Sequence, residues 1–95
     1  MDVVVLPGPL SYAEAAARYA ELRPADVEHP EVAAFHWELL ETSPDPGSLD
    51  SWSLTVGADA VIVHAAEQRL VDLVMLLAGQ HGLACYVPSR QEVRM

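Results

Sequence analysis

Residues 52–65 of the chain, Trp-Ser-Leu-Thr-Val-Gly-Ala-Asp-Ala-Val-Ile-Val-His-Ala, decide the fold that the sequence predicts. Apolar and polar side chains alternate over residues 52–56, which is typical of a strand with one face exposed to water. Gly57 to Asp59 can turn the chain back, and the run from Ala60 to Ala65 is apolar at every position except His64. Such a run is typical of a strand that is covered on both faces. The stretch therefore predicts a hairpin that joins an edge strand to a central strand.

A second strand is predicted near the start of the chain, from Asp2 to Leu6, where valine and leucine follow Asp2 without interruption. Pro7, Gly8 and Pro9 follow it and end the strand. Because it contains no alternation of polar and apolar side chains, this run also predicts a central strand.

Helical patterns occupy three segments outside these strands. Ser11 and Glu14 match a capping box at the start of the first helix. Pro30 suits the first position of a second helix. The third helix spans residues 67–80, and Gly82 is placed to end it in a left-handed cap.

The predicted order of elements is strand, helix pair, strand, strand, helix, strand, where the last strand covers residues 83–87. This order matches the ferredoxin-like arrangement β-α(α)-β-β-α-β, with an extra helix in the first crossover. We therefore expect an α+β fold with a four-stranded, mainly antiparallel sheet and helices on one face. In that arrangement the first and third strands are central, which agrees with the two continuous apolar runs.

Length and composition predict one domain over residues 1–95, with a folded core at residues 1–88 and a C-terminal tail at residues 89–95. The apolar content of 52% is far above that of disordered chains. The start of the chain lacks the basic residues of a signal peptide. The longest apolar helical stretch, residues 70–78, is too short to span a bilayer. A cytoplasmic location is expected.

The chain is strongly acidic, with fourteen acidic residues against five basic ones and a formal net charge of −9. Ten of the acidic residues lie in residues 1–50. Nucleic acids and anionic membranes require a positive patch, so the sequence excludes both as direct ligands. A basic protein is the natural complement.

Helices on one face would leave the other face of both central strands uncovered. A large contiguous apolar patch is unusual on the surface of a monomer. The sequence therefore predicts that a second copy, in a homodimer through the open sheet face, or a different protein covers that face. The alternative is that valine fills these strands because of its β-propensity alone.

The segment His81-Gly82-Leu83-Ala84-Cys85-Tyr86-Val87-Pro88 resembles the closing segment of a group of small actinobacterial α/β proteins. In those proteins a His-Gly-Leu step leads into a strand that finishes Tyr-Asp-Pro-Gln. The stretch from Pro30 to Phe35 and Trp52 also resemble that group, whereas Val87 and Ser89 replace its aspartate and glutamine. Some such proteins look like immunity partners of secreted toxins, so the resemblance implies a protein-binding role.

The sequence contains no recognisable catalytic or metal-binding constellation. The four histidines are His29, His36, His64 and His81. They lack the three- or four-residue spacing of metal-binding helices. No cofactor is expected. Neither a glycine-rich phosphate loop nor a nucleophile elbow is present. Cys85 lies among apolar residues and predicts a buried structural thiol.

Three residues are candidates for a pocket or a switch. His36 falls within the apolar stripe of the second helix, where the alternative is a core or rim histidine bonded to backbone. His64 and Glu67 form a candidate acid/base pair at the end of a central strand. His64 and Tyr86 are the residues expected to matter if the protein is a small homodimeric α+β-barrel enzyme or a small-molecule-binding protein.

The leading hypothesis is a non-enzymatic protein-binding module. An immunity or inhibitor protein is the example that it suggests. Its acidic second helix and the following loop would contact a basic partner, with Trp37 as the anchor. The partner-binding residues are Glu28, Glu31, Trp37, Glu38, Glu41, Asp45 and Asp50. Core packing of Trp37 and a merely solvated acidic face are the alternatives. A structural subunit of a larger assembly is a third possibility.

Overall fold

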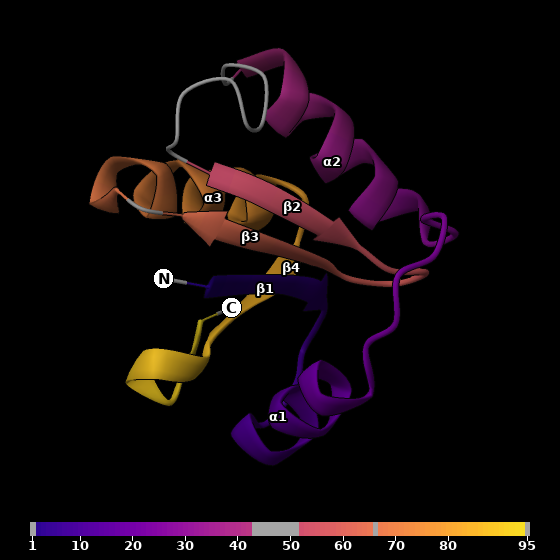
Figure 1. Ribbon diagram of the computed structural model, residues 1–95, viewed down its shortest axis with the longest axis vertical. Helices are drawn as coiled ribbons and strands as arrows, with labels where there is room; N and C mark the ends of the chain where they lie inside the picture. Colours follow the sequence, from indigo (N-terminus) through magenta and orange to yellow (C-terminus); the bar gives the residue numbers. More distant parts are fainter. Residues whose placement is uncertain (1, 43–51, 66, 95) are drawn as a thin grey trace.

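The structure is a computed structural model that describes residues 2–42, 52–65 and 67–94. Its elements follow the predicted order, and the α+β class is confirmed (Figure 1). They are β1 (Asp2–Pro7), α1 (Tyr12–Glu21), α2 (Pro30–Thr42), β2 (Trp52–Val56), β3 (Val61–Ala65), α3 (Gln68–Gln80), β4 (Leu83–Val87), a short 3-10 helix (Pro88–Arg90) and β5 (Glu92–Arg94).

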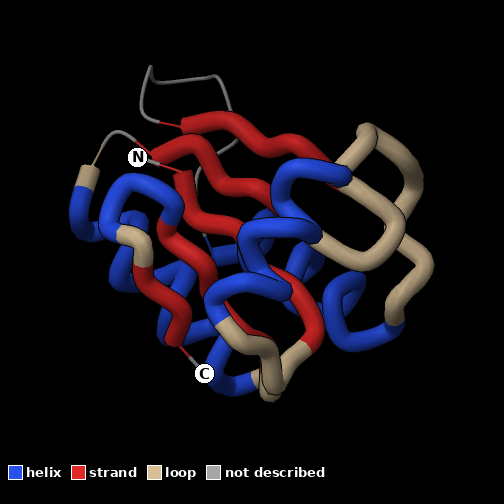
Figure 2. Tube along the Cα trace, turned by 90° about the horizontal axis from the view of Figure 1, so that it is seen from below, coloured by secondary structure: helices blue, strands red, loops and turns tan. Residues whose placement is uncertain are grey.

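Within the described residues, five strands form one antiparallel sheet in the order β2-β3-β1-β4-β5 (Figure 2). Both continuous apolar runs are interior strands, because β1 lies between β3 and β4, and β3 between β1 and β2. The predicted count of four strands is wrong. Residues 89–95, expected to form a tail, include β5, which pairs with β4. Three residues are too few to show an alternating pattern in the sequence.

Helices lie on both faces of the sheet, so the prediction that they cover one face is wrong (Figure 1). Buried side chains of α2 and α3 pack with Val3 and Val5 of β1 on the first face. On the second face, Ala15 of α1 packs with Val4 and Leu6. The alternation of side chains along β1 thus divides its apolar run between two cores.

The segment between α1 and α2 carries the chain from the second face to the first. It runs past the turn of the β2–β3 hairpin, where the Ala25 N–H donates to the Val56 carbonyl at 2.9 Å. The Glu28 N–H donates to the Ala58 carbonyl at 2.7 Å. Because α1 belongs to the same chain and covers the second face, that face is not left open. An open face was the reason for expecting a second copy to cover it.

Local signals in the sequence set the helix ends as expected. The Ser11 hydroxyl accepts from the Glu14 N–H at 3.2 Å, and the Glu14 carboxylate accepts from the Ser11 N–H at 3.4 Å, which completes the capping box. Gly82 follows α3 with φ of 70°, the left-handed conformation that favours glycine. No helix in the described ranges has the length and apolar content that a membrane span requires.

Candidate functional site

The outer face of α2 carries an exposed tryptophan between acidic residues. Trp37 is 68% exposed, so the alternative that it packs in the core is wrong. Leu40, three positions further, is also exposed, as are Glu31 and Glu41. We call these four residues the α2 surface.

The other acidic residues of the predicted binding surface differ in their surroundings. Glu38 is half-buried, and its carboxylate accepts a hydrogen bond from His81 Nε2 at 2.5 Å, which ties α2 to the end of α3. Glu28 is exposed in the loop before α2. Asp45 and Asp50 lie outside the described residues. Glu41 therefore lies beside Trp37, four positions further along the helix, whereas Glu31 is six positions before Trp37 and lies at the edge of the outer face. Glu38 has a structural contact.

His64 is paired with Asp2, so the predicted acid/base pair with Glu67 is wrong. His64 Nδ1 lies 2.9 Å from Asp2 Oδ1, and Nε2 lies 2.9 Å from the hydroxyl of Thr55. Asp2 stands directly across from His64 in the register of β1 and β3. Glu67 is instead at the cap of α3, where its carboxylate accepts from Arg69 at 3.2 Å.

A tyrosine of α1 completes this polar cluster, which we call the His64 network: Asp2, Tyr19, Thr55 and His64. The Tyr19 hydroxyl donates to Asp2 Oδ2 at 3.4 Å. Burial, together with the charge of Asp2 and this hydrogen bond, raises the pKa of Tyr19. Tyr19 therefore stays protonated and acts as a donor to the carboxylate. His64 and Asp2 are 37% and 35% exposed, so water and small solutes reach the network.

The sequence pattern contained part of the signal for this network. The alternation over residues 52–56 puts Thr55 on the face opposite Trp52, which is the face of His64. The contact of Asp2 with His64 was not predicted, because it depends on the register between β1 and β3, which pairs residues 62 positions apart. No local periodicity specifies such a pairing.

Tyr86 lies on the same face of the sheet as His64, whereas His36 does not. The Tyr86 ring is buried in the second core, where it makes edge-to-face contacts with Tyr12 and Tyr19 at centroid distances of 5.7 and 5.9 Å. Burial, followed by a hydrogen bond with Tyr12, raises the pKa of Tyr86. His36 is half-buried on α2, on the other side of the sheet.

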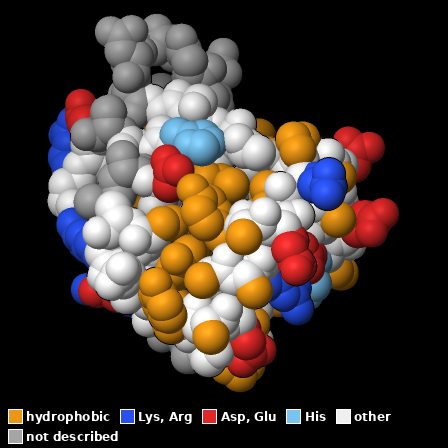
Figure 3. Space-filling view, turned by 60° about the horizontal axis from the view of Figure 1, so that its bottom comes forward, with side chains coloured by type: hydrophobic (Ala, Val, Ile, Leu, Met, Phe, Trp, Pro, Cys, Tyr) orange, Lys and Arg blue, Asp and Glu red, His pale blue; other side chains and the backbone are white. Residues whose placement is uncertain are grey.

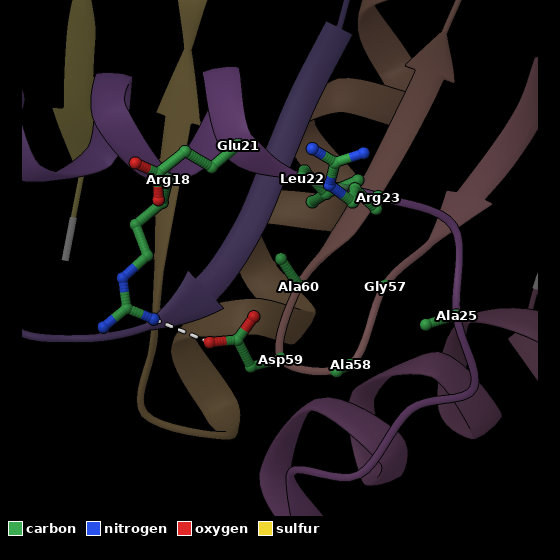
Figure 4. Close-up of a pocket in the computed structure, with 9 residues that line it drawn as sticks. All are labelled: Arg18, Glu21, Leu22, Arg23, Ala25, Gly57, Ala58, Asp59 and Ala60. Atoms are coloured by element: carbon green, nitrogen blue, oxygen red, sulfur yellow. Dashed lines mark hydrogen bonds and ion pairs between the residues drawn. The ribbon is translucent and has the colours of Figure 1, made fainter.

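A cavity of about 440 Å³ lies where the end of α1 meets the β2–β3 turn (Figure 4). Arg18 and Asp59 form an ion pair of 2.7 Å at its rim. The cavity was not predicted, because residues 18–25 and 57–60 meet only in the tertiary structure. Its lining residues are Arg18, Glu21, Leu22, Arg23, Ala25, Gly57, Ala58, Asp59 and Ala60.

Cys85 is buried in the first core, in agreement with the prediction of a structural thiol. Burial raises its pKa to about 12. Within residues 2–42, 52–65 and 67–94, no three His, Cys, Asp or Glu side chains are close enough together to hold a metal ion.

Comparison of the chain with known proteins gave no match to a protein family, to a curated protein or to a solved structure. The resemblance to small actinobacterial proteins therefore stays a prediction.

Proposed function

We propose that this protein is a protein-binding module whose α2 surface, which has no catalytic role, binds a basic partner. The exposure of Trp37 carries the proposal. Tryptophan is enriched among the residues that contribute most to binding energy. Covering its exposed indole ring removes apolar surface from water, which stabilises the complex. Core packing would leave no such ring at the surface.

Charge complementarity argues for the class of partner. Glu31 and Glu41 are exposed on the same helix as Trp37, and the whole chain has a formal net charge of −9. A basic surface meets these carboxylates without like-charge repulsion and is steered toward them at low ionic strength. Arginine fits best, because its guanidinium can bond carboxylates in pairs and stack on an indole.

An immunity or inhibitor protein is the specific form of this proposal. The resemblance to immunity-like actinobacterial proteins supports it, and so does the acidic α2 surface, which suits the blocking of a basic protein. We also propose that the complex forms in the cytoplasm. The single, unpaired Cys85 supports that location, since oxidising compartments favour paired cysteines.

We further propose that the fold is a variant of the ferredoxin-like arrangement. The order β2-β3-β1-β4 of the first four strands supports this assignment. The variant would differ by β5 at the edge of β4 and by α1 on the second face.

The test of the binding function is a cross-linking experiment followed by affinity measurements. A photoreactive amino acid replaces Trp37 in the source cell, and the control has it at Leu76, which is 60% exposed on α3. One basic protein should be cross-linked from position 37 and not from position 76. With that purified protein, Trp37→Ala should raise the Kd by at least about 30-fold, as expected for a residue that contributes about 2 kcal/mol or more.

The two kinds of residue in the α2 surface should act on different rate constants. Trp37→Ala should mainly raise the dissociation rate, whereas Glu31→Gln with Glu41→Gln should mainly slow association and weaken its dependence on salt. Leu76→Ala should leave both rate constants unchanged. Equal affinity of the wild type and Trp37→Ala for the cross-linked protein would refute the proposal.

A further inference from the structure

We propose that Thr55, His64 and Asp2 form a nucleophile, a general base and an orienting carboxylate, and that this site hydrolyses esters with a small acyl group. The proposal is independent of the α2 surface. It depends on the geometry of the His64 network, which joins three neighbouring strands on the second face of the sheet.

The two hydrogen bonds connect the residues in the order that nucleophilic catalysis requires. Thr55 Oγ1 lies 2.9 Å from His64 Nε2, and Asp2 Oδ1 lies 2.9 Å from His64 Nδ1. Hydroxyl–imidazole–carboxylate arrangements of this kind occur on unrelated folds and are identified by geometry and roles, not by sequence order. Here β2, β3 and β1 contribute one residue each.

The direction of both bonds follows from the donors available. An ionised carboxylate only accepts, so His64 Nδ1 carries the proton that points to Asp2. In the neutral ring Nε2 then has a free lone pair, and it accepts the Thr55 hydroxyl proton. Tyr19 donates to the second oxygen of Asp2 at 3.4 Å and holds the carboxylate in place.

The surroundings of the site favour a small apolar substrate. Thr55 and His64 are half-buried, and Ile62, which pairs with Thr55 across the hairpin, supplies an apolar floor on the same face. Apolar side chains gather on the α1 side of the molecule (Figure 3). The methyl group of Thr55 crowds its own hydroxyl oxygen, which disfavours esters branched next to the carbonyl carbon and favours a small acyl group such as acetyl.

Each step of the reaction balances. Thr55 Oγ1 attacks the ester carbonyl carbon and its proton passes to His64 Nε2. The bond between that carbon and the alcohol oxygen breaks, the alcohol takes the proton from His64, and an acyl-threonine remains. Water then gives a proton to Nε2 and attacks the acyl carbon. The carboxylic acid leaves, and Thr55 Oγ1 regains its proton from His64. Asp2 neither gives nor takes a proton in either step.

The experiment is hydrolysis of p-nitrophenyl acetate by the full chain, with mass-spectrometric mapping of the acetyl group. The wild type should carry acetyl on Thr55. Thr55→Val should lose this adduct, and His64→Gln should lower the rate at least about 100-fold, the lower range of general-base catalysis. Ser53→Ala, an exposed residue of the same strand, should behave like the wild type.

Further variants separate catalysis from folding. Thr55→Ser retains a hydroxyl, so it should fold, be acetylated at position 55 and turn over. Asp2→Asn tests the positioning residue: the acetylated site should stay the same, while the pH–rate profile should change because the tautomer of His64 is no longer imposed. Leu76→Ala, at an exposed position of α3, should leave hydrolysis unchanged. None of these variants alters the α2 surface, so a failure of the binding proposal is distinguishable. Acetylation at other positions only, or wild-type turnover by Thr55→Val, overturns the proposal.

Discussion

The buried thiol of Cys85 makes the stability of the protein depend on pH in the alkaline range. Burial raises the pKa of its thiol from 9.0 to about 12. Between these values the unfolded chain loses the thiol proton while the folded chain keeps it. The stabilising contribution is therefore complete below the unfolded pKa and is lost as pH rises toward the folded pKa.

We expect the free energy of unfolding to fall by about 1 kcal/mol per pH unit above about pH 9 because of this group. Urea unfolding of the wild type and of Cys85→Ala at about pH 8 and about pH 10.5 measures the effect. The variant should lose less stability over that interval, since it lacks the thiol and keeps the tyrosines. Equal pH dependence of the two proteins would contradict the prediction.

Phe35 and Trp37 are two positions apart on α2 but differ in their exposure to water. Phe35 is fully buried in the first core, whereas Trp37 is exposed. Phe35→Ala should lower the free energy of unfolding by about 3–5 kcal/mol, because it leaves a cavity among packed side chains. Trp37→Ala should change it by less than about 0.5 kcal/mol. Denaturant titrations of both variants check this contrast, and comparable losses would show that Trp37 is also needed for packing.

At the scale of single elements, α1 depends on its capping box. Ser11→Ala removes the acceptor for the Glu14 N–H and should lower the free energy of unfolding by about 1 kcal/mol. Ser11→Asp keeps a side-chain acceptor at the N-cap and should have nearly wild-type stability. Thermal unfolding followed by circular dichroism distinguishes the two variants. Equal loss from both would mean that the hydroxyl has a role other than capping.

The elements differ in how well the sequence predicts them. α1 and α3 have clear ends in the sequence, at Ser11 and Gly82, because their caps are local features of the backbone. β5 was missed, since Glu92, Val93 and Arg94 become a strand only through their pairing with β4. An element this short is stabilised by its neighbour more than by its own propensity.

For the whole molecule, the position of α1 decides whether the second face of the sheet is open. Ala15 of α1 is fully buried and packs within the second core. Ala15→Arg should detach α1 and expose that core, because an arginine side chain does not fit there. The variant should bind a hydrophobic dye and self-associate, which light scattering detects.

Ala17→Arg is the matched control, because Ala17 is exposed on the same helix. It adds the same charge and side chain without displacing α1, so it should behave like the wild type. A fully monomeric Ala15→Arg variant that binds no dye would show that α1 is not the cover of this face.

The sequence by itself determined the order of the helices and strands, the interior position of β1 and β3, the burial of Cys85 and the acidic charge. Each depends on composition or on a period of two or 3.6 residues, which neighbouring residues impose through backbone geometry. Only the tertiary structure decided which face α1 covers, the pairing of β5 and the contacts of His64 with Asp2 and Thr55. These features depend on register and on packing between residues far apart in the chain. The run from Val3 to Leu6 is apolar on both faces, so it does not specify which helix covers which face.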